Sequence, residues 1–335
     1  METSRPVRAT RLLSEPVVGP HSLAGYGAIF NAGLVEFGGV LHLVARAVRD
    51  GYSPDPTGAT RFRDYVSDVV VFVSRDGIHY HFDRVLLAAP PHGEWCYEDP
   101  RVQLVTGATG PRLVMTYTVL PLPPREQAPH YIGATPLVVR DGRLHLEPDA
   151  DPTHRLGPLG LANKDGVLSD LAGGRVALVQ RLGRDVQVAD FDTFEDLWTA
   201  DEHYWVPYLA DLDEHVIIRP GPDVLGVGAG APPLLTEHGL LLLYHERVAG
   251  GIYTMNAALL DARHANLLAV LDEPLLVPEL DWECHGDVDM VVFVQGAVRR
   301  GEDELYLTYG AADRCVGVAR IGLGDLLAAL TAPSR

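Results

Sequence analysis

The chain has 335 residues, 47% of them hydrophobic and 21% charged, so it is able to bury a large core and disorder is not expected. Its formal net charge of −18 repels nucleic-acid phosphates and anionic membrane surfaces, which excludes both as favoured partners. The 34 glycines and 25 prolines fall at short intervals, which is typical of many turns between short strands.

The N-terminal stretch from Met1 to Pro16 carries arginines but no apolar segment of a secretion signal. No run in the chain approaches the ~20 apolar residues of a membrane span, and we expect a cytoplasmic protein. The cysteines Cys96, Cys284 and Cys315 are odd in number and lack CxxC spacing, so we predict free thiols, with no disulfide, zinc site, metal or other cofactor.

Five apolar segments recur along the chain, each entered by a turn and closed by a large polar residue. The closing residues Arg46, Tyr117, Arg181, His245 and Tyr309 are 71, 64, 64 and 64 residues apart. A period of this length is a signature of radial β architectures. The segments are Gly39 to Arg46, Gly110 to Tyr117, Gly174 to Arg181, Gly239 to His245 and Glu302 to Tyr309.

Each period holds further strand candidates, and about four strands per period fit one blade of a propeller. We therefore predict an all-β fold, a five-bladed β-propeller, formed by residues 1–335 as one domain with a short C-terminal helical tail. A stacked β-solenoid is the alternative, but its repeats are shorter. Helical patterning is confined to short pieces, Phe194 to Thr199 and Leu323 to Leu330. The further strands include Asp68 to Ser74, Arg143 to Glu147, Asp185 to Ala189 and Tyr253 to Leu260.

The innermost strands of a propeller surround one axial pocket, and we take the five repeated segments as these strands. Their polar ends Arg46, Arg181 and His245 are then expected to be neighbours. A second set of polar turns precedes the same strands in phase, although turn chemistry alone also favours such residues. These turns are Asn31 to Gly33, Glu98 to Arg101, Asn163 to Asp165, Gly228 to Pro233 and Glu283 to Gly286.

The stretch from Tyr97 to Arg101 combines two acids and a base around Pro100. Because proline fixes its own backbone and restricts the residue before it, the carboxylate of Asp99 is expected on a stiff turn, as acid catalysis requires. A surface turn with a local ion pair between Asp99 and Arg101 is the alternative. The later run from Pro121 to Pro129 reads as a stiff insertion near the pocket mouth, either a lid or a longer connection.

Taken together in order, these stretches make the chain resemble glycoside hydrolase family 130, five-bladed propellers that cleave β-mannosides with phosphate or with water. No single motif is specific, but the ordered set spans nearly the whole chain. The matching stretches are Asn31 with Arg46, Val73 to Gly77, Glu98 to Arg101, Asn163 to Asp165 with Arg181, Gly228 to Pro233 with Thr236 and Glu237, Tyr244 with His245, Ala258 to Asp261, and Tyr309 to Asp313.

The resemblance implies roles for the polar residues. Asp99 matches the family's general acid, which is thought to protonate the leaving oxygen through a hydroxyl of the bound mannose. Polar side chains suit a hydroxyl-rich ligand because each fixed donor or acceptor rejects a sugar that lacks its partner. The substrate-binding positions at or beside the −1 sugar are Asn31, Arg46, Tyr97, Arg101 and Asp313.

A basic cluster binds phosphate in the family's phosphorylases, and here Lys164, Arg181 and His245 fall on its positions, with Tyr244 beside them. A further lysine is usual before the Gly-x-Gly-x-Pro-Pro run, where this chain has Gly226. The residue after His245 is usually glycine, and here it is Glu246. Losing a cation and gaining an anion weakens phosphate binding, and the added carboxylate could activate water.

We therefore expect an enzyme that cleaves a non-reducing-end β-mannosidic bond with inversion, with Asp99 as acid. Hydrolysis is slightly favoured, with Glu246 as the first candidate for the base and Glu237 as the second. Phosphorolysis to mannose 1-phosphate, with phosphate as co-substrate, is the close alternative, and a non-catalytic carbohydrate-binding propeller is another. The expected partner is a β-mannoside oligosaccharide. The linkage, the acceptor, a −1 sugar other than mannose and a homo-oligomeric state stay open.

Overall fold

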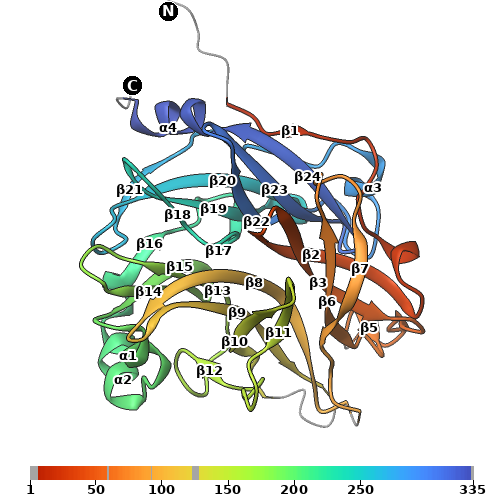
Figure 1. The fold of residues 1–335 in the computed structure, drawn as a ribbon, viewed down its shortest axis with the longest axis horizontal. Helices are drawn as coiled ribbons and strands as arrows, with labels where there is room; N and C mark the ends of the chain where they lie inside the picture. The colour runs from red at the N-terminus through yellow and green to blue at the C-terminus, as the bar shows by residue number, and fades with distance from the viewer. Residues whose placement is uncertain (1–6, 59, 92, 123–127, 333–335) are drawn as a thin grey trace, which may run out of the picture.

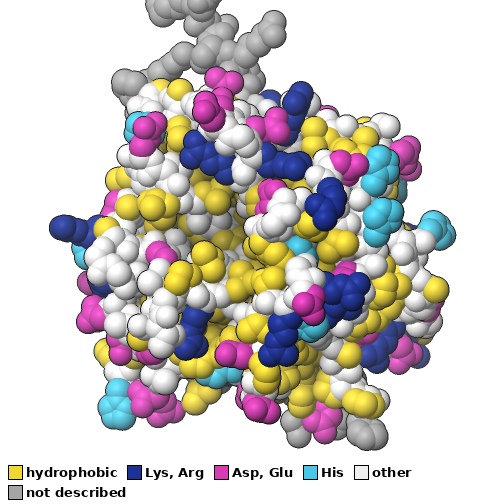
Figure 2. Space-filling view, viewed as in Figure 1, with side chains coloured by type: hydrophobic (Ala, Val, Ile, Leu, Met, Phe, Trp, Pro, Cys, Tyr) yellow, Lys and Arg dark blue, Asp and Glu magenta, His cyan; other side chains and the backbone are white. Residues whose placement is uncertain are grey.

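Five antiparallel sheets stand around a common centre in the computed structural model, which describes residues 7–58, 60–91, 93–122 and 128–332 (Figure 1). This arrangement confirms the predicted all-β five-bladed propeller. Acidic and basic side chains are interspersed over the face seen in Figure 2, rather than gathered in one acidic patch. No helix among the described residues is long and apolar enough to cross a membrane.

The first three blades follow one another along the chain. Blade 1 comprises β2 (Tyr26–Phe37), β3 (Val40–Arg49), β6 (Ser67–Ser74) and β7 (His81–Leu87), and the strand pair β4 (Ser53–Pro54) and β5 (Phe62–Arg63) is inserted between β3 and β6. Blade 2 comprises β8 (Trp95–Gly107), β9 (Gly110–Pro121), β10 (Tyr131–Arg140), β11 (Arg143–Leu146) and β12 (Arg155–Leu156). Blade 3 comprises β13 (Asn163–Asp170), β14 (Val176–Leu182), β15 (Asp185–Phe191) and β16 (Val216–Ile218).

The last two blades and the helices complete the ring. Blade 4 comprises β17 (Val224–Ala229), β18 (Leu234–Thr236), β19 (Gly239–Val248), β20 (Tyr253–Leu260) and β21 (Leu267–Val270). Blade 5 comprises β22 (Val292–Arg300), β23 (Glu304–Ala311), β24 (Cys315–Gly322) and the N-terminal β1 (Thr10–Arg11). The helices are α1 (Phe194–Trp198), α2 (Glu202–Ala210), α3 (Asp281–Cys284) and α4 (Leu323–Thr331), with 3-10 turns at Pro20–Ser22, Leu212–His215 and Ala249–Gly251.

The ring is closed by β1, which pairs with β24 through the register Thr10↔Arg320 and Arg11↔Ala319. The chain then continues into blade 1, so backbone hydrogen bonds tie its beginning to its last blade. The core lies in wedges between adjacent blades. In blade 4, Leu240 and Leu242 pack toward blade 3, while Leu241 and Leu243 pack toward blade 5. Because successive side chains of a strand point to opposite faces, one continuous apolar run fills the wedges on both sides of the blade.

The five repeated segments are correctly predicted as strands, but they are not the innermost ones. They correspond to β3, β9, β14, β19 and β23, which lie second in each blade. The strands at the centre are β2, β8, β13, β17 and β22; β2 contacts β8 and β22, and β13 contacts β8 and β17. The physical reason is that a second strand is covered on both faces and by both neighbours, so it carries the clearest apolar run.

Of two further sequence predictions, one is wrong and the other concerns residues that the structure only partly describes. The turn from Glu283 to Gly286 lies on and just after α3, not on the innermost strand of blade 5. The expected insertion from Pro121 to Pro129 includes 123–127, which lie outside the described residues. The three cysteines are free; Cys96 and Cys315 are buried, and Cys284 is partly exposed.

Candidate active site

A cavity of about 1100 Å³ lies at the centre of the propeller, and all five blades contribute side chains to it. The β4–β5 pair forms part of its wall through Phe62 and Arg63. The predicted site residues that line it are Asn31, Arg46, Asp99, Lys164, Arg181, His245 and Asp313. Arg46, Arg181 and His245 thus line one cavity, although they lie on the second strands of their blades and not on the innermost ones.

Local breaks in the innermost strands aim polar residues at the axis. Asn31, Asp99 and Asp165 each occupy a register shift and have positive φ angles of 45°, 53° and 56°. Asparagine and aspartate tolerate this left-handed backbone better than most residues, and bulges of this kind re-aim side chains beside active sites. In blade 5 the corresponding register shift holds Gln295, which donates to the backbone oxygens of Asn31 and Pro100.

The carboxylate of Asp99 is fixed through one of its two oxygens. Asn31 Nδ2 donates to Asp99 Oδ1 at 2.8 Å, and Arg46 Nη1 lies 3.6 Å from the same oxygen. Asp99 is only 7% exposed, and Arg101 binds its backbone oxygen instead of its carboxylate. The alternative of a surface turn with an Asp99–Arg101 ion pair is therefore wrong. The second oxygen, Oδ2, accepts no hydrogen bond from the described residues.

Arg101 supports the site from beneath and does not line the cavity. Its Nε donates to Gly230 O at 2.8 Å, and its Nη2 donates to Ala229 O at 3.0 Å and to Asp165 Oδ1 at 3.3 Å. Arg101 is 1% exposed, so a sugar in the cavity has no access to its guanidinium. The expectation that Arg101 binds substrate is corrected: it positions Asp99 and Asp165.

Asp165 organises the basic side of the cavity. Arg181 Nε lies 3.0 Å from Asp165 Oδ2, and His245 Nε2 lies 3.8 Å from the same oxygen. Gly228 makes this approach possible, because a Cβ there would stand 2.4 Å from Asp165 Oδ2 and 2.5 Å from the His245 ring. Arg181 is thereby held with its guanidinium at the cavity wall.

Two groups at this wall have unused hydrogen-bonding capacity. Among the described residues, neither ring nitrogen of His245 has a hydrogen-bond partner, although the residue is 1% exposed. Beyond the backbone pairing of Lys164 with Arg181 in the sheet, its side chain forms no hydrogen bond and no ion pair within the described part of the chain. Buried polar atoms are nearly always paired, so unpaired ones that line a cavity indicate a place for a ligand. Asn31 Oδ1 and Arg46 Nε, in the same cavity, are also unpaired in the described structure.

The charge states at this wall follow from burial and neighbours. Burial lowers the pKa of His245 well below its usual value, and the nearby positive charges of Arg101 and Lys164 lower it further, so the ring is neutral. Burial also lowers the pKa of Lys164, but the carboxylates of Asp165, Asp99 and Glu98 together raise it above its usual value. The wall therefore presents two cations, Lys164 and Arg181, beside a neutral imidazole.

Carboxyl groups gather on the other side. Glu98 forms an ion pair with Arg46, and burial raises the pKa of Glu98 despite the opposing effect of Arg46. Burial likewise raises the pKa of Asp313 to about 7, while Arg46 opposes the shift. Among the described residues, no group of three or more His, Cys, Asp or Glu side chains is arranged to hold a metal ion.

Three predicted site residues face away from the cavity, because side chains alternate along a strand. Tyr97 packs edge-to-face against Tyr117, and its hydroxyl accepts a hydrogen bond from Trp95 Nε1. Tyr244 is buried in the wedge between blades 3 and 4 and donates to Glu246 at 3.3 Å. Neither Tyr97, Tyr244 nor Glu246 lines the cavity. Their predicted contacts with sugar or nucleophile are corrected accordingly.

Neither candidate for the general base is in position. Glu246 follows His245 on β19 and is therefore on the opposite face of the strand. The side chain of Glu237 is 81% exposed, lies 3.6 Å from His238, and is absent from the described cavity lining. The geometry contradicts the role proposed for both carboxylates.

Several residues of the site are not among those predicted from the sequence. Glu98, Arg247, Tyr253 and Phe293 line the cavity, and Asp165 lies beneath it. The alternation of β19 is the signal that would have identified Arg247, which is two residues beyond His245 and so on the same face. The Phe293 ring lies tilted by 36° against the His245 ring, with 4.3 Å between centroids. This contact joins two blades, so no local sequence pattern indicates it.

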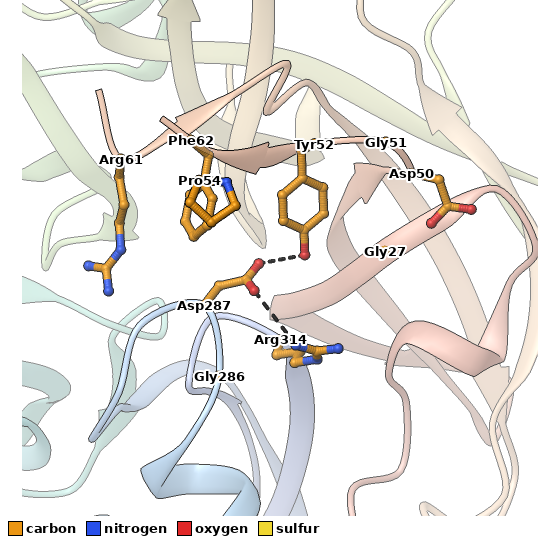
Figure 3. A pocket seen from close by; sticks show the side chains of 10 residues that line it. All are labelled: Gly27, Asp50, Gly51, Tyr52, Pro54, Arg61, Phe62, Gly286, Asp287 and Arg314. Carbon is orange, nitrogen blue, oxygen red and sulfur yellow. Dashed lines mark hydrogen bonds and ion pairs between the residues drawn. The ribbon is translucent and has the colours of Figure 1, made fainter. Parts of the chain in front are cut away.

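A second, smaller cavity of about 620 Å³ lies beside the first and shares Arg61 and Phe62 with it (Figure 3). One of its two acidic groups is paired: Tyr52 donates to Asp287 Oδ2 at 2.6 Å, and Arg314 Nη1 lies 3.8 Å from Asp287 Oδ1, while Asp50 is the other acidic residue of the lining. None of the site residues predicted from the sequence is among the described residues that line this second cavity.

Comparisons with known proteins agree with this architecture. A family model described as β-1,4-mannooligosaccharide phosphorylase matches residues 207–331. A β-1,2-mannobiose phosphorylase from Thermoanaerobacter sp. (strain X514) is 30% identical over 94% of this chain and 97% of its own length. A 1,2-β-oligomannan phosphorylase from the same organism is 27% identical over 96% of this chain and 99% of its own length.

A solved structure shares the fold. The β-1,2-mannobiose phosphorylase from Listeria innocua, in complex with β-1,2-mannobiose, matches with a TM-score of 0.71 and 22% identity, over 96% of this chain and 99% of that chain. The similarity in sequence and in architecture extends over nearly the full length. The chain belongs to glycoside hydrolase family 130.

Proposed function

We propose that the protein is an inverting phosphorylase that removes the non-reducing-end mannosyl unit of a β-1,2-linked mannoside and transfers it to inorganic phosphate, giving mannose 1-phosphate. The observation that carries this proposal is the wall of Lys164, Arg181 and His245, which has cationic charge and unpaired donors. Such groups match the oxygens of a phosphate ion. The names of the relatives, which are phosphorylases of β-1,2-mannosides, support both the nucleophile and the linkage.

On the sugar side, Asp99 is the proposed acid. Its Oδ1 accepts from Asn31, so Oδ2 carries the proton that passes through a hydroxyl of the bound mannose to the leaving oxygen. Asn31, Arg46 and Asp313 line the same part of the cavity and offer fixed hydrogen-bonding groups to the sugar hydroxyls. Arg101 keeps Asp99 in place through the backbone oxygen of that residue.

On the phosphate side, one phosphate oxygen forms the new bond to the anomeric carbon while the bond from that carbon to the leaving oxygen breaks. Lys164 and Arg181 neutralise the attacking anion and align it. A neutral His245 donates one hydrogen bond without adding charge. Asp165 orients Arg181 from below, so the cluster is assembled before phosphate arrives.

Hydrolysis by the same cavity is the alternative, and it loses its main support when Glu246 faces away from the sugar. The other carboxylates around the sugar have different roles in this proposal: Glu98 is paired with Arg46, Asp99 is assigned to the acid, and Asp313 is assigned to the sugar hydroxyls. The assignment of phosphate as nucleophile therefore requires fewer additional groups.

The test is to incubate the protein with β-1,2-, β-1,3- and β-1,4-mannobiose, with and without phosphate, and to quantify mannose 1-phosphate and free mannose. We expect phosphate-dependent release from the β-1,2-linked substrate. Free mannose at a rate independent of phosphate would overturn phosphorolysis and support hydrolysis. Binding of the disaccharide without any turnover would instead support a carbohydrate-binding propeller.

A further inference from the structure

Gly226 and Arg247 are register partners on β17 and β19 of blade 4. Residues directly opposite each other in an antiparallel pair are immediate neighbours. A Cβ at Gly226 would stand 4.0 Å from Arg181 Nη1 and 3.8 Å from Arg184 O, in ordinary contact and without a clash. This position therefore borders the basic wall and has room for a side chain, but it supplies none.

Arg247 brings a guanidinium to the same region from the opposite strand. It lines the central cavity together with His245, two residues earlier on the same strand. Both side chains lie against Tyr253: the Arg247 guanidinium is 5.7 Å from its ring centroid, and the His245 ring is 5.9 Å from it. The two side chains are thus brought to one place by a shared aromatic neighbour.

Nothing in the described part of the chain neutralises Arg247. Its guanidinium has no ion pair and no hydrogen bond with the described residues, whereas Arg181 is held by Asp165 and Arg46 by Glu98. An exposed, unpaired arginine at the mouth of a cavity whose floor carries Lys164 and Arg181 extends the positive potential outward. In a protein with a net charge of −18, such local charge is needed to attract an anion.

We propose that Arg247 is a phosphate-binding residue and supplies, from β19, the cation that Gly226 does not supply from β17. The assignment rests on the proposed phosphorolysis and adds to it. Arginine fits the role because its planar fork donates two parallel hydrogen bonds to phosphate oxygens. Tyr253 limits the orientations of that fork through its ring.

The expected effect of Arg247→Ala is a rise of about tenfold or more in the KM for phosphate, because a charge-assisted hydrogen bond to the anion is lost. The KM for mannobiose should change by less than about twofold, since the sugar is held by other residues. Arg247→Lys should retain part of the affinity. Adding Gly226→Lys to Arg247→Ala should restore phosphate binding, because the new lysine starts 4.0 Å from Arg181 Nη1.

Arg320→Ala is the matched control, because it removes the same charge from an exposed pair with Glu304 on blade 5. The four variants and the parent are compared by initial rates at varied phosphate and, independently of turnover, by calorimetric titration with inorganic phosphate. Thermal melting verifies that each variant is folded. The control should bind phosphate as the parent does.

The two readouts separate the inference from the proposed function. If the parent makes mannose 1-phosphate but Arg247→Ala keeps the parent's KM for phosphate, the role of Arg247 is overturned and phosphorolysis stands. If the parent releases only free mannose, the proposed phosphorolysis is overturned. The calorimetric titration with phosphate then tests the role of Arg247 by itself. Phosphate that binds the parent at least tenfold more tightly than Arg247→Ala upholds the assignment. Equal binding, or no binding to the parent, overturns it.

Discussion

Replacing Arg101 with methionine should destabilise the whole propeller and not merely weaken sugar binding. The side chain is 1% exposed, and its donors satisfy the backbone oxygens of Asp99, Ala229 and Gly230 as well as Asp165 Oδ1. Methionine fills a similar volume but removes the donors to Asp165 Oδ1 and to the three backbone oxygens, and leaves Asp165 with Arg181 as its remaining ion-pair partner. Breaking a buried charged pair from one side costs about 3–5 kcal/mol, a large share of a typical stability of about 5–15 kcal/mol.

The assay is urea unfolding of the parent, Arg101→Met and the control Arg320→Met, followed by kcat/KM on the preferred mannobiose. The control removes an exposed arginine, so its unfolding free energy should change by less than about 1 kcal/mol. Arg101→Met should lose both stability and activity, because Asp99 and Asp165 lose their common anchor. A variant with the parent's stability and only a raised KM for mannobiose would show that Arg101 contacts sugar, as the sequence had indicated, and would refute the positioning role.

Three further substitutions test individual roles. Asp99→Asn should lower kcat by about 10²–10⁴-fold while mannobiose binding, measured by calorimetry, changes little; undiminished turnover would remove Asp99 as the acid. Glu246→Gln should retain the parent's kcat/KM within about twofold, because Glu246 faces away from the cavity; loss of turnover would restore it as a base. For Asp313, burial raises the folded pKa to about 7, above the ordinary value of about 4. Between these values the folded state binds more protons, so stability falls as pH rises from about 4 to 7, by at most ~4 kcal/mol, and Asp313→Asn should remove this fall. Identical pH dependence of urea unfolding in parent and variant would contradict it.

The architecture was accessible from the sequence because the second strand of each blade is apolar throughout. Leu240 to Leu243 fill two wedges at once, and this repeated demand produces the regular 64-residue spacing. The innermost strands were not recognised as such, because their apolar runs are interrupted by bulges at Asn31, Asp99 and Asp165. Helix α2 also escaped prediction, because Pro207 lies inside it and breaks the expected pattern.

The sequence predicted some residues of the candidate site correctly and misplaced or missed others. Residues that end a repeated segment or occupy a bulge, such as Arg46 and Asp99, were found because the repeat brings them together. The errors at Tyr97, Tyr244 and Glu246 share one cause: neighbours of a site residue in sequence point to the opposite side of a strand. Asp165 was overlooked as an organiser because its partners, Arg101 and Arg181, come from two different blades.

The central claim is that phosphate held by Lys164, Arg181 and His245 attacks a mannosyl unit whose leaving group is protonated by Asp99. The most direct test is to follow the reaction of β-1,2-mannobiose with excess phosphate by proton and phosphorus NMR from the first turnovers. The account predicts α-mannose 1-phosphate and mannose in equal amounts, because a single displacement inverts the β configuration. β-Mannose 1-phosphate, or mannose alone with no phosphate consumed, would contradict it.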